Sequence, residues 1–126
     1  PMEDKECEWQ VAAFGMLGLE TALSVVQKTM VDTGAISWAQ VAQVLSANPA
    51  RIGRVAEHGR PLAAGEPANL VLFDPNASRV VDAKDTASLS RNNPYAGIEL
   101  PGKVVHTMLR GRFTVRDGEL SEGVRA

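Results

Sequence analysis

The chain has 126 residues, of which 44% are hydrophobic and 22% charged, and its formal net charge at pH 7 is −2. This length suits one domain or pieces of two, and the hydrophobic content is ordinary for a globular protein. The slightly acidic balance gives no basic surface for nucleic acid, and no apolar run approaches the roughly 20 residues of a membrane span.

The cysteine content indicates a cellular compartment, and the first residues indicate whether the chain is part of a longer protein. The single cysteine, Cys7, excludes an intramolecular disulfide and is typical of a reducing cytoplasm. Pro1 and the charged run that follows it are more typical of the interior of a longer sequence than of a natural start. We therefore expect a cytoplasmic segment of a larger protein.

Residues 1–18 combine charges with glycines and predict a loop that crosses the surface of a larger structure. A helix is predicted next, because its apolar residues recur at intervals of three and four and share one stripe. These residues are Leu19, Leu23, Val26 and Met30. Gly34 is expected to end this helix, since glycine adopts the left-handed cap conformation without strain.

A second helix is predicted to begin after Ser37, which forms a capping-box pattern with Gln40. The residue before a proline avoids the helical conformation, so the pair Asn48-Pro49 is expected to end this helix. Its expected buried stripe consists of Trp38, Val41 and Leu45.

The second half of the chain predicts short strands. Residues 70–73 are apolar without alternation, so we expect this strand to be covered on both faces. Further strands are predicted at residues 79–82, 104–109 and 113–115, with a helical turn in the polar stretch 85–93. The pairs Arg110-Gly111 and Asp117-Gly118 are typical of tight hairpin turns.

These elements amount to two helices followed by a small, mainly antiparallel β-unit. The predicted elements give the N-terminal loop nothing to pack on. They also leave one face of the strand at residues 70–73 without a layer to cover it. The chain is therefore expected to complete structural layers whose other helices and strands come from outside this chain. The alternative is a self-contained α+β domain.

Several motifs resemble, in the same order, those of the amidohydrolase superfamily and, within it, the dihydroorotase family. They are residues 3–8, 14–23, 48–53, 67–74 and 90–95. The Pro-Tyr form of the last motif also occurs in allantoinases and dihydropyrimidinases, which remain alternatives.

The resemblance implies an α/β protein. Residues 1–60 would be the end of a metal-dependent (β/α)8 (TIM) barrel, comprising an active-site loop and the last helices. Residues 61–126 would be the C-terminal part of a composite β-sandwich, with antiparallel strands. The rest of the same enzyme would supply the other strands.

The same resemblance implies reversible hydrolysis of L-dihydroorotate to N-carbamoyl-L-aspartate in pyrimidine biosynthesis. It places the zinc and the catalytic aspartate outside this chain, so the chain alone is expected to be inactive. A possible homodimer is also implied. An inactive dihydroorotase-like structural subunit and a freestanding interaction domain remain alternatives.

Phe14 and Gly15 are the predicted substrate-binding residues, because the resemblance places their backbone beside the dihydroorotate ring. Glycine permits close approach of main-chain groups to a ligand, although a plain turn before the helix would explain Gly15 equally well.

No catalytic residue and no metal ligand is predicted within the chain. His58 and His106 are isolated from each other, whereas catalytic zinc sites use about three protein ligands. We expect His58 to face solvent and His106 to be packed. Arg91 and Arg110 are interpreted as structural, and Cys7 has no His or predicted helix N-terminus near it in the sequence, so it is not predicted to be a nucleophile.

Overall fold

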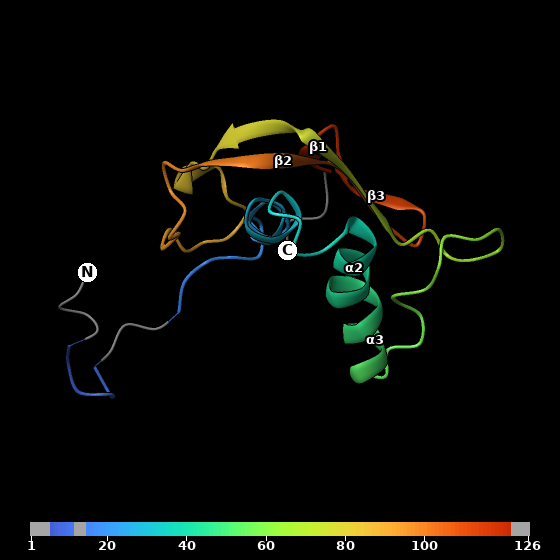
Figure 1. Cartoon of the computed structure of the whole chain (residues 1–126), viewed down its shortest axis with the longest axis horizontal. Helices are drawn as coiled ribbons and strands as arrows, with labels where there is room; N and C mark the ends of the chain where they lie inside the picture. Colours follow the sequence, from blue (N-terminus) through green and yellow to red (C-terminus); the bar gives the residue numbers. More distant parts are fainter. Residues whose placement is uncertain (1–5, 12–14, 122–126) are drawn as a thin grey trace.

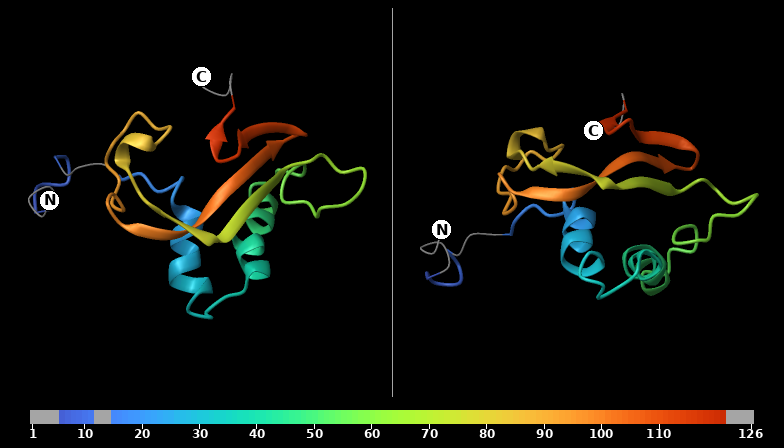
Figure 2. Two further views of the ribbon diagram at one scale, coloured as in Figure 1. Left: turned by 90° about the horizontal axis from the view of Figure 1, so that it is seen from above. Right: turned by 45° about the horizontal axis from the view of Figure 1, so that its top comes forward.

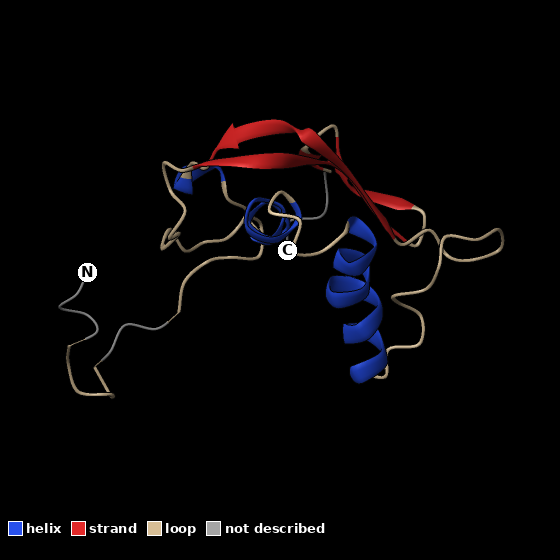
Figure 3. Ribbon diagram, in the orientation of Figure 1, coloured by secondary structure: helices blue, strands red, loops and turns tan. Residues whose placement is uncertain are grey.

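The computed structural model of the chain describes residues 6–11 and 15–121. Two helical stretches lie on one face of an antiparallel sheet (Figure 1 and Figure 3). The first stretch consists of α1 (Ala22–Val26) and the π-helical turn η1 (Gln27–Val31); the second consists of α2 (Trp38–Ala42), the π-helical turn η2 (Gln43–Ala47) and α3 (Asn48–Ile52). The strands are β1 (Leu70–Val80), β2 (Glu99–Leu109), β3 (Arg112–Arg116) and β4 (Glu119–Leu120), and the 3₁₀ helix η3 (Ala83–Asp85) follows β1.

The sheet has four strands in the order β1-β2-β3-β4. The long hairpin of β1 and β2 pairs from Leu70 opposite Met108 to Val80 opposite Glu99. Figure 2 shows this twisted hairpin from above and tilted, with the two helical stretches side by side beneath it. The predicted strands at residues 104–109 and 113–115 lie within β2 and β3.

Both predicted hairpin turns are confirmed. Arg110 and Gly111 have φ angles of 49° and 78°, and Asp117 and Gly118 have φ angles of 53° and 85°. Two successive residues with positive φ are the signature of the type I′ turn, whose twist matches that of the flanking strands. These turns connect β2 to β3 and β3 to β4.

β1 is continuous from Leu70 to Val80, and the prediction of two short strands separated by Asp74-Pro75 was wrong. The register shifts between Asp74 and Ser78, so Pro75 lies in an irregularity of the strand. Proline has no N–H to donate to the ladder and is tolerated at such a bulge. The strand therefore passes through the proline instead of ending there.

Within the described residues, β1 is covered on one face only. Phe73 contacts the ring of Trp38 on α2, with ring centroids 5.4 Å apart. Val71 and Leu72 remain 53% and 50% exposed. The described residues therefore supply only one of the two covers predicted for residues 70–73, and the second stays a prediction for the rest of the protein.

The first helix turns a different side to the sheet from the one expected. The residues buried by the sheet are Thr21, Ser24 and Gln27, each at most 5% exposed. Leu19 is 93% exposed and Met30 is 40% exposed, so these two members of the predicted apolar stripe do not pack on this sheet. The reason is a close approach: the Ser24 hydroxyl donates to the main-chain carbonyl of Gly102 on β2, at 3.3 Å.

The second helix begins as predicted. The hydroxyl of Ser37 accepts from the Gln40 N–H at 3.3 Å, and the Gln40 side chain accepts from the Ser37 N–H at 2.8 Å. Gly34, with φ of 74°, ends the preceding helical stretch, also as predicted. In the predicted stripe, Val41 is 4% exposed but Leu45 is 48% exposed, so only part of that stripe is buried.

The prediction that Asn48-Pro49 ends the second helix was wrong. Asn48 keeps helical dihedrals, with φ of −67° and ψ of −46°, and the helix continues to Ile52. The π-helical turn η2 shifts the hydrogen bonding, so that the Asn48 N–H donates to the Gln43 carbonyl. Pro49 then occupies the first turn of α3, where its missing N–H is tolerated.

The helical turn predicted in residues 85–93 begins two residues earlier, at Ala83, and is only three residues long. It is η3, which ends at Asp85 and is capped by Asp82, whose carboxylate accepts from the Lys84 N–H at 2.8 Å. Residues 86–93 are irregular. Of the described helices, none combines the length and apolarity needed to cross a membrane.

The hydrophobic interior formed by the described residues is small. Its buried apolar side chains are Val41, Val81 and Leu100. Large apolar side chains elsewhere are open to solvent, for example Leu62 at 79% and Leu89 at 98%. Contiguous exposed apolar surface on a folded chain marks a site of interaction.

Candidate functional site

The predicted substrate-binding loop lies just before the first helix. Gly15 is exposed and has a positive φ of 35°, and a Cβ added there would meet no atom within 4 Å. Its backbone is therefore open to an approaching ligand, and its conformation is one that glycine adopts without strain. Phe14, the other predicted substrate-binding residue, lies outside the described residues.

Asn92 joins this loop to the irregular segment between β1 and β2. The Asn92 side-chain amide donates to the Gly15 carbonyl at 2.7 Å, across 77 positions of sequence. The Asn92 carbonyl accepts from the Leu17 N–H at 2.8 Å. Two of the motifs that were recognised separately in the sequence are thus in direct contact.

The start of the first helix is tied to the same segment. The Glu20 carboxylate accepts from the Ala87 N–H at 3.0 Å, and the Glu20 carbonyl accepts from the Arg79 guanidinium at 3.0 Å. The Thr21 N–H and hydroxyl both donate to the Gly18 carbonyl at 3.2 Å. These bonds fix the loop relative to the sheet.

Arg91 stabilises the irregular segment from inside. Its guanidinium donates to the Thr86 hydroxyl at 3.2 Å and to the carbonyls of Ser88 and Ser90, the latter at 3.0 Å. Its bonds therefore close the segment on itself, and the structural interpretation of Arg91 is confirmed.

The histidines lie where the sequence placed them. His58 is exposed. His106 packs edge-on against Phe113, with ring centroids 5.4 Å apart, and its Nδ1 accepts from the Asp117 N–H at 3.1 Å. Within the part of the chain that the structure describes, no three His, Cys, Asp or Glu side chains gather as a metal site.

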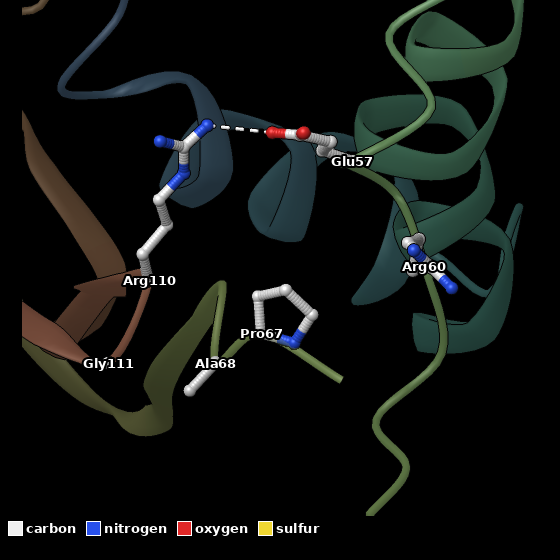
Figure 4. Close-up of a pocket in the computed structure, with 6 residues that line it drawn as sticks. All are labelled: Glu57, Arg60, Pro67, Ala68, Arg110 and Gly111. Atoms are coloured by element: carbon white, nitrogen blue, oxygen red, sulfur yellow. Dashed lines mark hydrogen bonds and ion pairs between the residues drawn. The ribbon is translucent and has the colours of Figure 1, made fainter. Parts of the chain in front are cut away.

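A pocket of about 480 Å³ opens near the start of β1 and the turn between β2 and β3 (Figure 4). Its lining consists of Glu57, Arg60, Pro67, Ala68, Arg110 and Gly111. Figure 4 shows Arg110 reaching across the pocket to Glu57, at 2.7 Å. Arg60 pairs with Glu66 at 2.6 Å. Both arginines of this pocket thus have carboxylate partners, as the structural interpretation of Arg110 leads us to expect.

Asn69 is hydrogen-bonded to both Glu57 and Arg110. Its side-chain amide donates to the Glu57 carbonyl at 3.2 Å and accepts from the Arg110 N–H at 2.7 Å. It therefore joins the connector after α3 to the turn between β2 and β3.

Comparison with known proteins identifies relatives of nearly the whole chain. The sequence profile described as "Amidohydrolase family" matches residues 8–114. A dihydroorotase of Streptomyces coelicolor is 60% identical over 121 residues, which are 96% of this chain and 28% of that protein. A dihydroorotase of Mycobacterium tuberculosis is 50% identical over 119 residues, covering 94% of this chain and 28% of that protein.

Solved structures give a second comparison. An L-hydantoinase (dihydropyrimidinase) from Arthrobacter aurescens superposes with a TM-score of 0.79 and 34% identity, covering 96% of this chain and 28% of that one. A D-hydantoinase from a Bacillus species superposes with a TM-score of 0.70 and 31% identity, over 79% of this chain and 22% of that one. The chain thus spans little more than a quarter of the length of the curated relatives that it matches.

Proposed function

We propose that this chain, which belongs to the amidohydrolase family, is the C-terminal part of a zinc-dependent dihydroorotase. The observation that carries the proposal is the 60% identity to a dihydroorotase across 96% of the chain. The solved hydantoinases match the fold but share less sequence, at 31% and 34% identity. The whole enzyme would interconvert L-dihydroorotate and N-carbamoyl-L-aspartate in pyrimidine biosynthesis, in the cytoplasm.

In this proposal the chain contributes to substrate binding and leaves the reactive groups to the rest of the enzyme. The Phe14-Gly15 backbone would lie beside the dihydroorotate ring. The exposed position and positive φ of Gly15 support this role. The described residues offer no cluster of three metal ligands, so the residues present do not fit a zinc site, and we place the zinc outside this chain.

The remainder of the same enzyme would cover the surfaces that this chain leaves open. Residues 1–60 would end the (β/α)8 barrel and residues 61–126 would complete a β-sandwich. The exposure of Leu19 in the turn before α1, at 93%, and of Met30 on η1, at 40%, supports this arrangement, as do the half-exposed Val71 and Leu72 on β1. A homodimer of the complete enzyme is part of the same proposal.

A hydantoinase or dihydropyrimidinase activity is the second candidate, because the solved neighbours carry those names at TM-scores of 0.70 and 0.79. The substrates differ in one group that matters for recognition. L-dihydroorotate carries a carboxylate that dihydrouracil and hydantoin lack. A site built to bind that carboxylate should reject the analogues, because its polar groups would be left unpaired.

The test is a comparison of substrates with the full-length protein. We expect kcat/KM for L-dihydroorotate to exceed the values for dihydrouracil, hydantoin and allantoin by about 10³-fold or more. A preference for one of the other cyclic amides would establish the second candidate instead. Absence of turnover with all of them, in a folded and zinc-supplemented protein, would indicate an inactive structural subunit.

A further inference from the structure

Asn92 is placed to hold the predicted substrate-binding loop from both sides. Its side-chain amide donates to the Gly15 carbonyl at 2.7 Å, and its own carbonyl accepts from the Leu17 N–H at 2.8 Å. The two bonds bracket the intervening residue, Met16. We propose that Asn92 is a positioning residue, which fixes the Gly15–Met16 peptide in the orientation that binds substrate. This inference rests on the proposed dihydroorotase function.

The orientation follows from peptide geometry. The described chain contains no cis peptide bond, so the Met16 N–H points opposite to the Gly15 carbonyl. Since Asn92 holds that carbonyl, the Met16 N–H is directed away from Asn92. Without the bond from Asn92, glycine at position 15 could adopt many other backbone conformations, because it lacks a Cβ. The bond therefore selects one of these conformations before substrate arrives.

Asn92 can act as a fixed support because its own segment is anchored. The Asn92 N–H donates to the Ser90 hydroxyl at 3.3 Å, and the segment returns to β2 through a pair of main-chain bonds. These are the bonds from the Gly97 N–H to the Val81 carbonyl, at 2.8 Å, and from the Val81 N–H to the Ile98 carbonyl, at 3.0 Å. Val81 is only 3% exposed. Binding groups are held most accurately by residues that are themselves locked in place.

The chain contains a matched control at the next position. Asn93 uses its side-chain oxygen, which accepts from the Tyr95 N–H at 3.0 Å. An aspartate at position 93 can still accept this bond. An aspartate at position 92 cannot donate to the Gly15 carbonyl and would place a negative charge against it. The same amide-to-carboxylate change thus removes the hydrogen bond to Gly15 at position 92. At position 93 it keeps the hydrogen bond from Tyr95.

The experiment compares Asn92→Asp and Asn93→Asp in the full-length enzyme. We expect Asn92→Asp to raise KM for L-dihydroorotate about tenfold, the size expected when one hydrogen bond is lost, with a smaller change in kcat. Asn93→Asp should leave KM within about twofold of the unchanged enzyme. Both variants should unfold within roughly 3 °C of it, because Asn92 is exposed and Asn93 is only partly buried.

Asn92→Ala removes the donor without adding a charge and decides the question if Asn92→Asp does not fold. A KM for Asn92→Ala that matches that of Asn93→Asp, in an enzyme that turns over L-dihydroorotate, would overturn the positioning role. Failure of the proposed function looks different, since the unchanged full-length enzyme would then lack activity on L-dihydroorotate.

Discussion

Changing Gln27 to glutamate is expected to lower the free energy of unfolding of the full-length protein by about 3 kcal/mol or more at neutral pH. Gln27 is 5% exposed and lies between the first helix and the sheet. Its side-chain amide donates to the Pro75 carbonyl of β1 at 2.9 Å. A carboxylate at this position loses that donor and buries a charge beside a carbonyl oxygen.

The surroundings of Gln27 offer such a charge little compensation. The side-chain oxygen of Gln27 is itself buried, with no hydrogen-bond partner among the described residues. An ionised carboxylate without a partner is far more costly to bury than an amide. The destabilisation is therefore expected to come from the charge, since the two side chains are almost identical in shape.

The control is the same substitution at Gln40. Gln40 occupies the third position of α2, where its side-chain oxygen accepts from the Ser37 N–H at 2.8 Å. Glutamate serves equally well in a capping box, so Gln40→Glu should change stability by less than about 0.5 kcal/mol. Thermal unfolding of both variants measures the difference. Equal losses of stability would show that the Gln27 environment is not as the structure describes it.

Changing Gly102 to alanine is expected to destabilise the protein by about 3 kcal/mol. Gly102 is buried on β2 with φ of 79°, and an added Cβ would overlap the ring of Phe73 and the side-chain oxygen of Gln27. Both the strained backbone and the overpacking contribute, each on the order of 1–3 kcal/mol. Gly102 is thus a position at which the helix packs closely on the sheet, beside Phe73.

Gly97→Ala separates the two contributions. Gly97 has nearly the same φ, 78°, but an added Cβ there would meet no atom within 4 Å. This variant should lose only the backbone contribution, about 1 kcal/mol. In the full-length protein, the melting temperature of Gly102→Ala should therefore be well below that of Gly97→Ala. The same melting temperature for both would contradict the close packing at Gly102.

Local signals in the sequence were sufficient for the turns and caps. The capping box at Ser37 and Gln40 and the tight turns at residues 110–111 and 117–118 depend on a few neighbouring residues, so their chemistry can be read directly. Breaks at prolines were predicted less well. Pro49 and Pro75 are both accommodated, one by a π-helical turn and the other by a bulge.

The side of the first helix that packs on the sheet could not be predicted from its apolar stripe. The sheet side holds Thr21, Ser24 and Gln27, because the close approach at Gly102 favours short side chains and hydrogen bonds. Their recurrence at every third position was the available signal. The apolar stripe indicates a second surface, which this chain alone does not bury.

The candidate site comes from the resemblance and stays a prediction. Gly15 was identified in this way, and it is exposed, with no atom within 4 Å of an added Cβ. The importance of Asn92 was missed, although its motif was recognised. A hydrogen bond across 77 positions depends on the tertiary path of the chain, which residue spacing does not reveal.

The most direct test of the central claim is dihydroorotate turnover by this chain, by the rest of the enzyme, and by the two expressed together. If this chain supplies supporting layers and a substrate-binding loop while the reactive groups lie elsewhere, neither part alone should turn over L-dihydroorotate. Co-expression should restore measurable activity, with Leu19 and Met30 protected from solvent in the complex. Turnover of L-dihydroorotate by the 126-residue chain alone would contradict the account.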